Sequence, residues 1–93
     1  MQFQWDPAKS AFNIQKHGVD FNDATGVFDG EMVITYDGRE DYGEDRWLVV
    51  GWCRGALTTV VFTDRGDGEI LRLISARAAT RKEQLYYEQT IGY

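Results

Sequence analysis

The chain has few of the residues that build metal centres and disulfide frameworks. Among 93 residues there is one cysteine, Cys53, and one histidine, His17. A lone cysteine excludes an intrachain disulfide framework and favours a cytoplasmic protein. Zinc sites of the usual type draw several ligands from cysteine and histidine, so we expect neither a metal nor a cofactor. Cys53 lies in an apolar run, and we interpret it as a packed side chain.

Long apolar segments are also missing. No apolar run approaches the roughly 20 residues that a membrane-spanning helix needs, and no basic-then-apolar leader opens the chain. We therefore expect a cytoplasmic protein that does not contact membranes. A hydrophobic content of 43% is typical of a folded chain, and the length suits a single domain over residues 1–93.

Net charge is −5, and the charges are unevenly distributed along the chain. Residues 1–45 hold ten acidic and three basic residues, whereas residues 46–93 hold five acidic and seven basic ones. All but one of those seven basic residues are arginines. Generic nucleic-acid-binding proteins are basic, so the acidic net charge of this chain argues against that class. The arginine-bearing second half nevertheless indicates a cationic site on an acidic body.

Helix signals dominate the first thirty residues. The Asp-Pro pair at residues 6–7 predicts a helix start, and Gly18 predicts its left-handed end. A second, short helix is expected to begin at the capping residue Asp20. Three apolar side chains of the first helix are expected to face the core: Ala8, Ala11 and Phe12.

From residue 31 the apolar residues change from a helical period to a period of two. Four strands joined by hairpins are predicted over residues 32–36, 46–53, 57–63 and 70–75. After a turn at residues 75–77, Thr80 and Glu83 match a capping box, which predicts a closing helix. The expected fold is α+β, with two N-terminal helices, a four-stranded antiparallel sheet and a C-terminal helix. The three tryptophans are assigned to the core: Trp5, Trp47 and Trp52.

Three arginines, Arg72, Arg77 and Arg81, fall at the predicted junction between the last strand and the closing helix. A buried strand has no structural need for an unpaired arginine, because desolvating the guanidinium is costly. Arg72 is therefore expected on an open sheet face or in an ion pair, and both indicate phosphate or carboxylate recognition. Arg81 would lie among the free amide groups of the helix start, where an anion is favoured. The stretch thus predicts a phosphate pocket at this helix start.

Several motifs together resemble one known family. They are the opening FQWDPAKSAFNIQKHGVDF, the central GEDRWLVVG, the strand pair TDRGDGEILRLISAR and the closing ATRKE. From Phe3 to about Tyr87 the chain looks like the BrnT toxins. The resemblance implies the toxin half of a type II toxin–antitoxin pair, with a RelE-like ribonuclease fold, RNA cleavage and translation arrest. It also implies a hetero-oligomer with a BrnA-like, DNA-binding antitoxin that buries the active face of the toxin.

RNA cleavage without a metal needs a base for the 2′-hydroxyl, an acid for the leaving oxygen and cations for the phosphorane. One histidine excludes a two-histidine mechanism within one chain, so arginines dominate the candidate set. The candidate phosphate and transition-state clamps are Arg65, Arg72, Arg77 and Arg81. Glu44 and Arg46 match the E-x-R of the family and are candidates for an acid–base group and a further clamp. Glu83 is assigned to the helix cap rather than to the base. Structural ion pairs are the alternative for each of these residues.

Three further residues are candidate substrate contacts: Lys9, His17 and Tyr86. His17 falls at a helix C-terminus, which favours its charged form, and Lys9 lies two turns earlier on the same side. Tyr86 offers a ring on which an RNA base can stack. The alternatives are a histidine that satisfies helix carbonyls and a tyrosine that packs at the rim of the core.

A second functional hypothesis follows from the negative net charge. A catalytically inactive interaction module would bind an acidic partner segment through the same arginine face. Tight partner binding without RNA cleavage at low salt would select this hypothesis over the ribonuclease.

Overall fold

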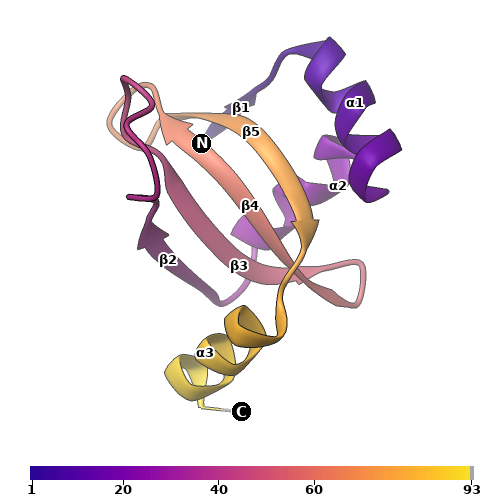
Figure 1. Cartoon of the computed structure of the whole chain (residues 1–93), viewed down its shortest axis with the longest axis vertical. Helices are drawn as coiled ribbons and strands as arrows, with labels where there is room; N and C mark the ends of the chain where they lie inside the picture. The colour runs from indigo at the N-terminus through magenta and orange to yellow at the C-terminus, as the bar shows by residue number, and fades with distance from the viewer. Residues whose placement is uncertain (93) are drawn as a thin grey trace.

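The computed structural model describes residues 1–92 as a five-stranded sheet with helices on both of its faces (Figure 1). The strands follow the order β1-β5-β4-β3-β2, in which β1 is parallel to β5 and the other pairs are antiparallel. The elements, of which η1 is a 3₁₀-helix, are β1 (Gln2–Gln4), α1 (Pro7–His17), α2 (Phe21–Ala24), η1 (Thr25–Phe28), β2 (Met32–Tyr36), β3 (Trp47–Cys53), β4 (Ala56–Asp64), β5 (Ile70–Ala78) and α3 (Arg81–Ile91).

The α+β class is confirmed, but the sheet differs from the prediction in two ways. It is mixed and has five strands, because residues 2–4 pair with the edge of β5 as the parallel strand β1. In addition, β5 does not turn at residues 75–77 but continues to Ala78. The predicted second helix is only four residues long and passes directly into η1, which contains Gly26.

The helix ends obey the local sequence signals. Asp6 accepts a hydrogen bond from the backbone of Ala8 at the start of α1, and Gly18 ends this helix with φ of 72°. At α3 the capping box forms in both directions, since Thr80 and Glu83 each accept a hydrogen bond from the other's backbone amide. These interactions involve residues close in sequence, which explains why the sequence predicts them.

The buried face of α1 is polar, so the predicted apolar stripe is wrong. Phe12 is 61% exposed, whereas Ser10 and Asn13 are buried. The amide of Asn13 accepts from the backbone N–H of Ala76 (3.1 Å) and donates to the carbonyl oxygens of Ala76 and Val19 (both 2.8 Å). β1 pairs only with residues 70–72 of β5. Beyond the end of β1, the side chain of Asn13 takes its place and hydrogen-bonds to the backbone of β5.

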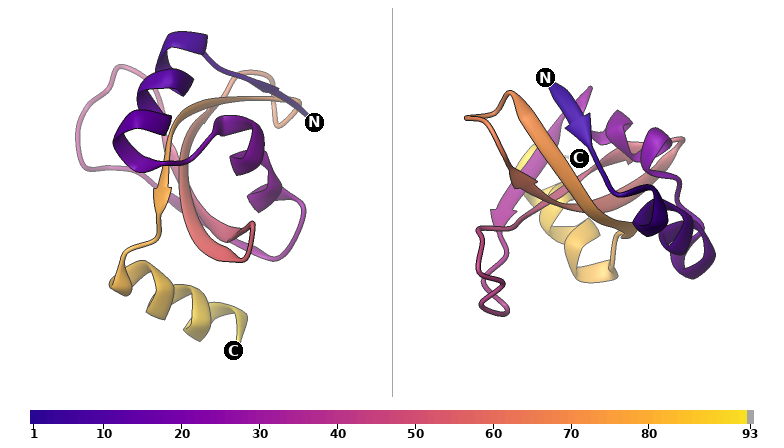
Figure 2. Two further views of the ribbon diagram at one scale, coloured as in Figure 1. Left: turned by 90° about the vertical axis from the view of Figure 1, so that its right-hand side faces the viewer. Right: turned by 90° about the horizontal axis from the view of Figure 1, so that it is seen from above.

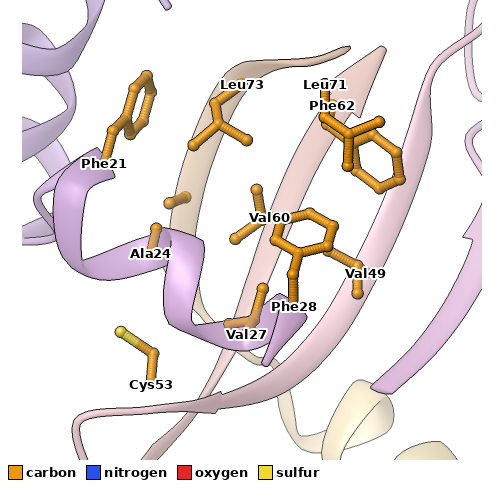
Figure 3. Close-up of a cluster of buried hydrophobic side chains, with 11 residues drawn as sticks. Phe21, Ala24, Val27, Phe28, Val49, Cys53, Val60, Phe62, Leu71 and Leu73 are labelled. Carbon is orange, nitrogen blue, oxygen red and sulfur yellow. The ribbon is translucent and has the colours of Figure 1, made fainter. Parts of the chain in front are cut away.

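One sheet face packs against α2 and η1 and forms the main core (Figure 3). Phe21, Ala24 and Val27 from these short helices are fully buried there. η1 lies so close to β3 that a Cβ at Gly51 would stand 2.9 Å from the carbonyl oxygen of Val27. Strand residues complete this cluster: Val49, Val60, Phe62, Leu71 and Leu73.

α3 packs against the other face of the sheet through Tyr87, which contacts a second cluster containing Val33 and Val50. In Figure 1 and in the left view of Figure 2, α1 and α2 lie together and α3 lies apart from them. Because α3 reaches only part of this face, the rest stays open. No helix among residues 1–92 is long and apolar enough to span a membrane.

The tryptophan assignment is correct for two of the three residues. Trp5 and Trp47 pack against the main core. Trp52 is 52% exposed, so its assignment to the core is wrong. Trp52 alternates with core-facing Cys53 on β3, which turns its ring toward the open face.

A β-bulge in β5 determines which arginines share a face. The pairing of β4 with β5 shifts by one residue between Val61 and Phe62, which makes Ile74 the extra residue. Strict alternation along β5 would put Arg72 and Arg77 on opposite faces. With the bulge both lie on the open face, since their β4 partners are Thr63 and Thr59.

Candidate active site

Arg46, Thr63 and Arg72 lie in one row across the open face. Thr63 pairs with Arg72, and the β3–β4 register, carried back one residue from Trp47, puts Arg46 on the other side of Thr63. Neighbouring strands are about 4.8 Å apart, so the two arginines flank the threonine within reach of one bound group. We call Arg46, Arg65 and Arg72, together with Glu44, the arginine cluster.

Glu44 links two of these arginines. Nε of Arg46 lies 3.3 Å from one carboxylate oxygen, and Nη2 of Arg65 lies 3.0 Å from the other. Arg65 also donates through Nε to Oγ1 of Thr63 (3.1 Å), and the guanidinium of Arg46 stacks on Tyr42 at 4.1 Å from the ring centroid. These contacts orient the carboxylate and both guanidinium groups before any ligand arrives.

Arg72 differs from the other two arginines of the cluster. It is partly buried in the sheet face, yet among residues 1–92 its guanidinium has neither a hydrogen bond nor an ion pair. The guanidinium fork is suited to bidentate contacts with phosphate or carboxylate oxygens. Arg72 is therefore the cation of the cluster with its full binding capacity available.

The loop between β2 and β3 carries Glu44 and is anchored by Asp37. This carboxylate is buried and accepts two hydrogen bonds of 2.8 Å from the guanidinium of Arg39. The hydrogen bond from Arg39 lowers the pKa of Asp37 and outweighs the effect of burial. Beside the loop, a cleft of about 650 Å³ is lined by Glu44, Arg65 and Thr63, and also by Trp47 and acidic neighbours.

Arg77 and Arg81 lie outside the arginine cluster. Arg77 makes a bidentate ion pair with Glu83, with distances of 2.7 and 3.0 Å. The same carboxylate accepts from the backbone of Thr80 and from Thr59, so it already occupies the anion position at the start of α3. Arg81 is exposed on the first turn. The predicted phosphate pocket at this helix start is therefore filled by the protein's own Glu83.

These contacts also make Glu83 an unsuitable general base. Partial burial alone would raise its pKa, but the hydrogen bonds from Arg77, the Thr80 backbone and Thr59 lower the pKa to about 2. A carboxylate with so low a pKa is a weak proton acceptor. The assignment of Glu83 to the helix cap agrees with this geometry.

Acid should expose the contribution of Glu83 to stability. Its pKa is lower in the folded chain than in the unfolded one, so its stabilising effect is complete above pH 4.5 and is lost as the pH falls to about 2. Between pH 6 and pH 2.5, the free energy of unfolding of the parent should fall by about 1–2 kcal/mol more than that of Glu83→Gln, after allowance for solvent screening. Urea unfolding at both pH values measures this difference. Glu88→Gln is the matched control, and equal pH slopes for both variants and the parent would contradict the assignment.

The three predicted substrate contacts are not brought to the arginine cluster. Lys9 and His17 are exposed on α1, which lies along the outer edge of β5. His17 lines a separate cleft with Asp20 and Arg54. Tyr86 is 51% exposed on α3. Their roles in RNA binding stay predictions.

Two residues of the site were missed by the sequence reasoning. Thr63 is buried at the centre of the row and receives the hydrogen bond from Arg65. Tyr42 forms the stacking surface for Arg46. The sequence contained a signal for Thr63, because this residue is the first of the TDR motif at residues 63–65. The tyrosine lies in an irregular loop, where spacing carries no information on contacts.

Among residues 1–92, a carboxylate held between two arginines lies beside a third arginine with neither a hydrogen bond nor an ion pair, and guanidinium groups match the geometry of phosphate oxygens. Comparison with known families gives one match. The chain matches the family described as ribonuclease toxin, BrnT, of type II toxin-antitoxin system over residues 5–83, and it belongs to that family. A search of curated proteins gave no match.

Proposed function

We propose that this chain is a metal-independent endoribonuclease that cleaves RNA, and thereby arrests translation, through its arginine cluster. Family membership supplies the coarse activity, that of a ribonuclease toxin. The observation that carries the finer proposal is Arg72, which has neither a hydrogen bond nor an ion pair among residues 1–92, beside the Glu44–Arg46–Arg65 contacts. A RelE-like arrangement of the active face is part of this proposal.

The chemistry follows from the groups present. Glu44 takes the proton of the 2′-hydroxyl, whose oxygen forms a bond to the adjacent phosphorus. Arg72 and Arg65 stabilise the charge on the phosphorane, and this electrostatic contribution is the largest one in such reactions. The bond from phosphorus to the 5′-oxygen then breaks, and the leaving oxygen takes a proton from water at the open face. The products are a 2′,3′-cyclic phosphate and a 5′-hydroxyl.

The acidic body sets the conditions for RNA binding. Phosphate contacts supply much of the affinity of proteins for RNA, and this chain carries a net charge of −5. Binding therefore depends on a few arginines against a repulsive background, and we expect it to weaken steeply with salt. A BrnA-like, DNA-binding antitoxin that covers the arginine cluster in a hetero-oligomer completes the proposed system.

Inducible expression in bacteria tests the proposal. The parent chain is expected to arrest growth, and the double variant Glu44→Gln, Arg72→Ala should relieve the arrest at equal soluble protein levels. Neither substitution alters the core or a helix cap, so the variant should accumulate to the same extent. Normal growth with abundant soluble parent chain would contradict the proposal.

One observation favours a second candidate function. Glu44 already binds Arg46 and Arg65, and this contact supports a cluster that accepts a carboxylate. The same contact supports an inactive module that binds an acidic partner segment through the arginine cluster. Partner binding without any RNA cleavage at low salt distinguishes it from the ribonuclease.

A further inference from the structure

An apolar groove of about 350 Å³ lies on the sheet face opposite the arginine cluster. Phe62 and Leu71 on its floor belong to the main core, which places the groove on the face that carries α2 and η1. These helices leave this end of the face uncovered. The remaining principal wall residues are Phe28, Met32, Ile34 and Trp47.

The groove opens beside a strand edge without protection. β2 forms one edge of the sheet, and its residues Met32–Tyr36 include no charge and no proline (Figure 1). Ile34 is 49% exposed and Tyr36 is 55% exposed. Natural edge strands usually carry charges or proline that prevent pairing with another chain. An open edge next to an exposed apolar patch marks an interaction surface.

The surroundings of the groove are acidic, and this decides the kind of partner. Asp64 lines the groove, and Asp67 and Glu69 are exposed in the adjoining β4–β5 turn. Among residues 1–92, neither Asp67 nor Glu69 has an ion pair. At the other end of β2, the loop at residues 37–45 adds five acidic residues. A second copy of this chain would bring like charges together, whereas a basic segment complements the surface.

We propose that the groove holds a segment of the antitoxin in which apolar side chains are flanked by lysine or arginine. This inference rests on the proposed function, since toxin–antitoxin pairing supplies the partner. A stable interface buries about 1,200–2,000 Å², so the groove is one anchor within a larger contact. The groove shares Trp47 and Asp64 with the cleft beside the arginine cluster, but Ile34 lines the groove and not that cleft. Substitution of Ile34 therefore tests anchoring at the groove separately from coverage of the arginine cluster.

A pair of exposed isoleucines provides the test. The product of the reading frame next to the gene of this chain serves as the probe, and its affinity is measured by calorimetry. Ile34→Lys should weaken binding by about tenfold or more, whereas Ile14→Lys on α1, where Ile14 is 45% exposed, should leave it unchanged. RNA cleavage by each free variant should equal that of the parent. Ile34→Thr keeps a β-branched side chain in the strand and should show a smaller loss.

A charge variant separates the acidic rim from the apolar floor. Glu69→Lys should weaken binding at low salt, and the effect should fade at 1 M salt, where screening is nearly complete. Unchanged affinity of both Ile34 variants would overturn the inference even if the parent cleaves RNA. Equal losses for Ile34→Lys and Ile14→Lys, or a neighbouring product that does not bind, would also overturn it. Groove-dependent binding without RNA cleavage would support the docking site and reject the ribonuclease proposal.

Discussion

Replacing Arg72 by alanine is expected to slow RNA cleavage by about 10²–10³-fold, which is the usual effect of removing one preorganised donor to a transition-state oxygen. The guanidinium has no structural partner among residues 1–92, so the fold should tolerate its loss. The decrease should fall mainly on kcat, since the phosphorane carries more charge than the ground-state phosphate. Single-turnover cleavage of a short RNA at low salt measures it.

Two variants control for charge alone. Arg72→Lys retains the positive charge but lacks the planar fork, and it should recover only part of the rate. Arg81→Ala removes an exposed arginine outside the arginine cluster and should change the rate by no more than about twofold. If Arg81→Ala slowed cleavage as much as Arg72→Ala, general electrostatic attraction would explain the result, and the assigned role of Arg72 would be wrong.

Glu44→Gln should lower the cleavage rate by about 10²–10⁴-fold, the range typical of a lost general base. Glutamine keeps only one of the two oxygens, so it can still accept a hydrogen bond from either Arg46 or Arg65 but not from each through its own oxygen. Arg65 retains its hydrogen bond to Thr63 and Arg46 its stacking on Tyr42, so both guanidinium groups keep one contact. The variant also loses the ability to accept the proton of the 2′-hydroxyl. Single-turnover cleavage of a short RNA by the variant and the parent measures the decrease.

Asp45→Asn is the matched control for this substitution. Asp45 is the adjacent acidic residue and is exposed, and among residues 1–92 its carboxylate accepts a hydrogen bond only from the hydroxyl of Tyr36 (3.1 Å). Its substitution should leave the rate nearly unchanged. If Glu44→Gln cleaved RNA at the parent rate, Glu44 would be a structural counter-ion of the arginines and not the base.

Local signals predicted much of the fold. Asp6, Gly18 and the Thr80–Glu83 box define helix ends through contacts within a few residues, so the sequence contains the whole interaction. Strands β2, β3 and β4 were predicted from alternation, which depends only on which face is buried. The parallel pairing of β1 with β5 joins residues about seventy positions apart, and no local pattern encodes such a pairing.

The bulge at Ile74 had the largest consequence for the site. Simple alternation separates Arg72 from Arg77, and only the shifted β4–β5 register puts both on the open face. Asn13 holds β5 just beyond the bulge through the backbone of Ala76, whereas the sequence predicted that Ala8, Ala11 and Phe12 would face the core. Buried amides of this kind are recognised only when the partner strand is known.

The prediction of the candidate site was incomplete for a related reason. Glu44, Arg46, Arg65 and Arg72 come together, but their grouping depends on strand register rather than on proximity in sequence. Arg77 was expected in a turn before the closing helix, but it lies in β5, and its bidentate contact with Glu83 joins this strand to the capping box. An ion pair and a phosphate clamp use the same residue types, so composition alone does not separate them.

Product analysis decides whether this chain cleaves RNA without a metal ion. A single-stranded RNA is incubated with the purified chain at low salt in the presence of a metal chelator, beside the same RNA carrying 2′-deoxy nucleotides. Cleavage of the RNA to 2′,3′-cyclic phosphate and 5′-hydroxyl ends is predicted, with no cleavage at the 2′-deoxy positions. Intact RNA, or cleavage that requires a metal ion and leaves 3′-hydroxyl ends, would contradict the account.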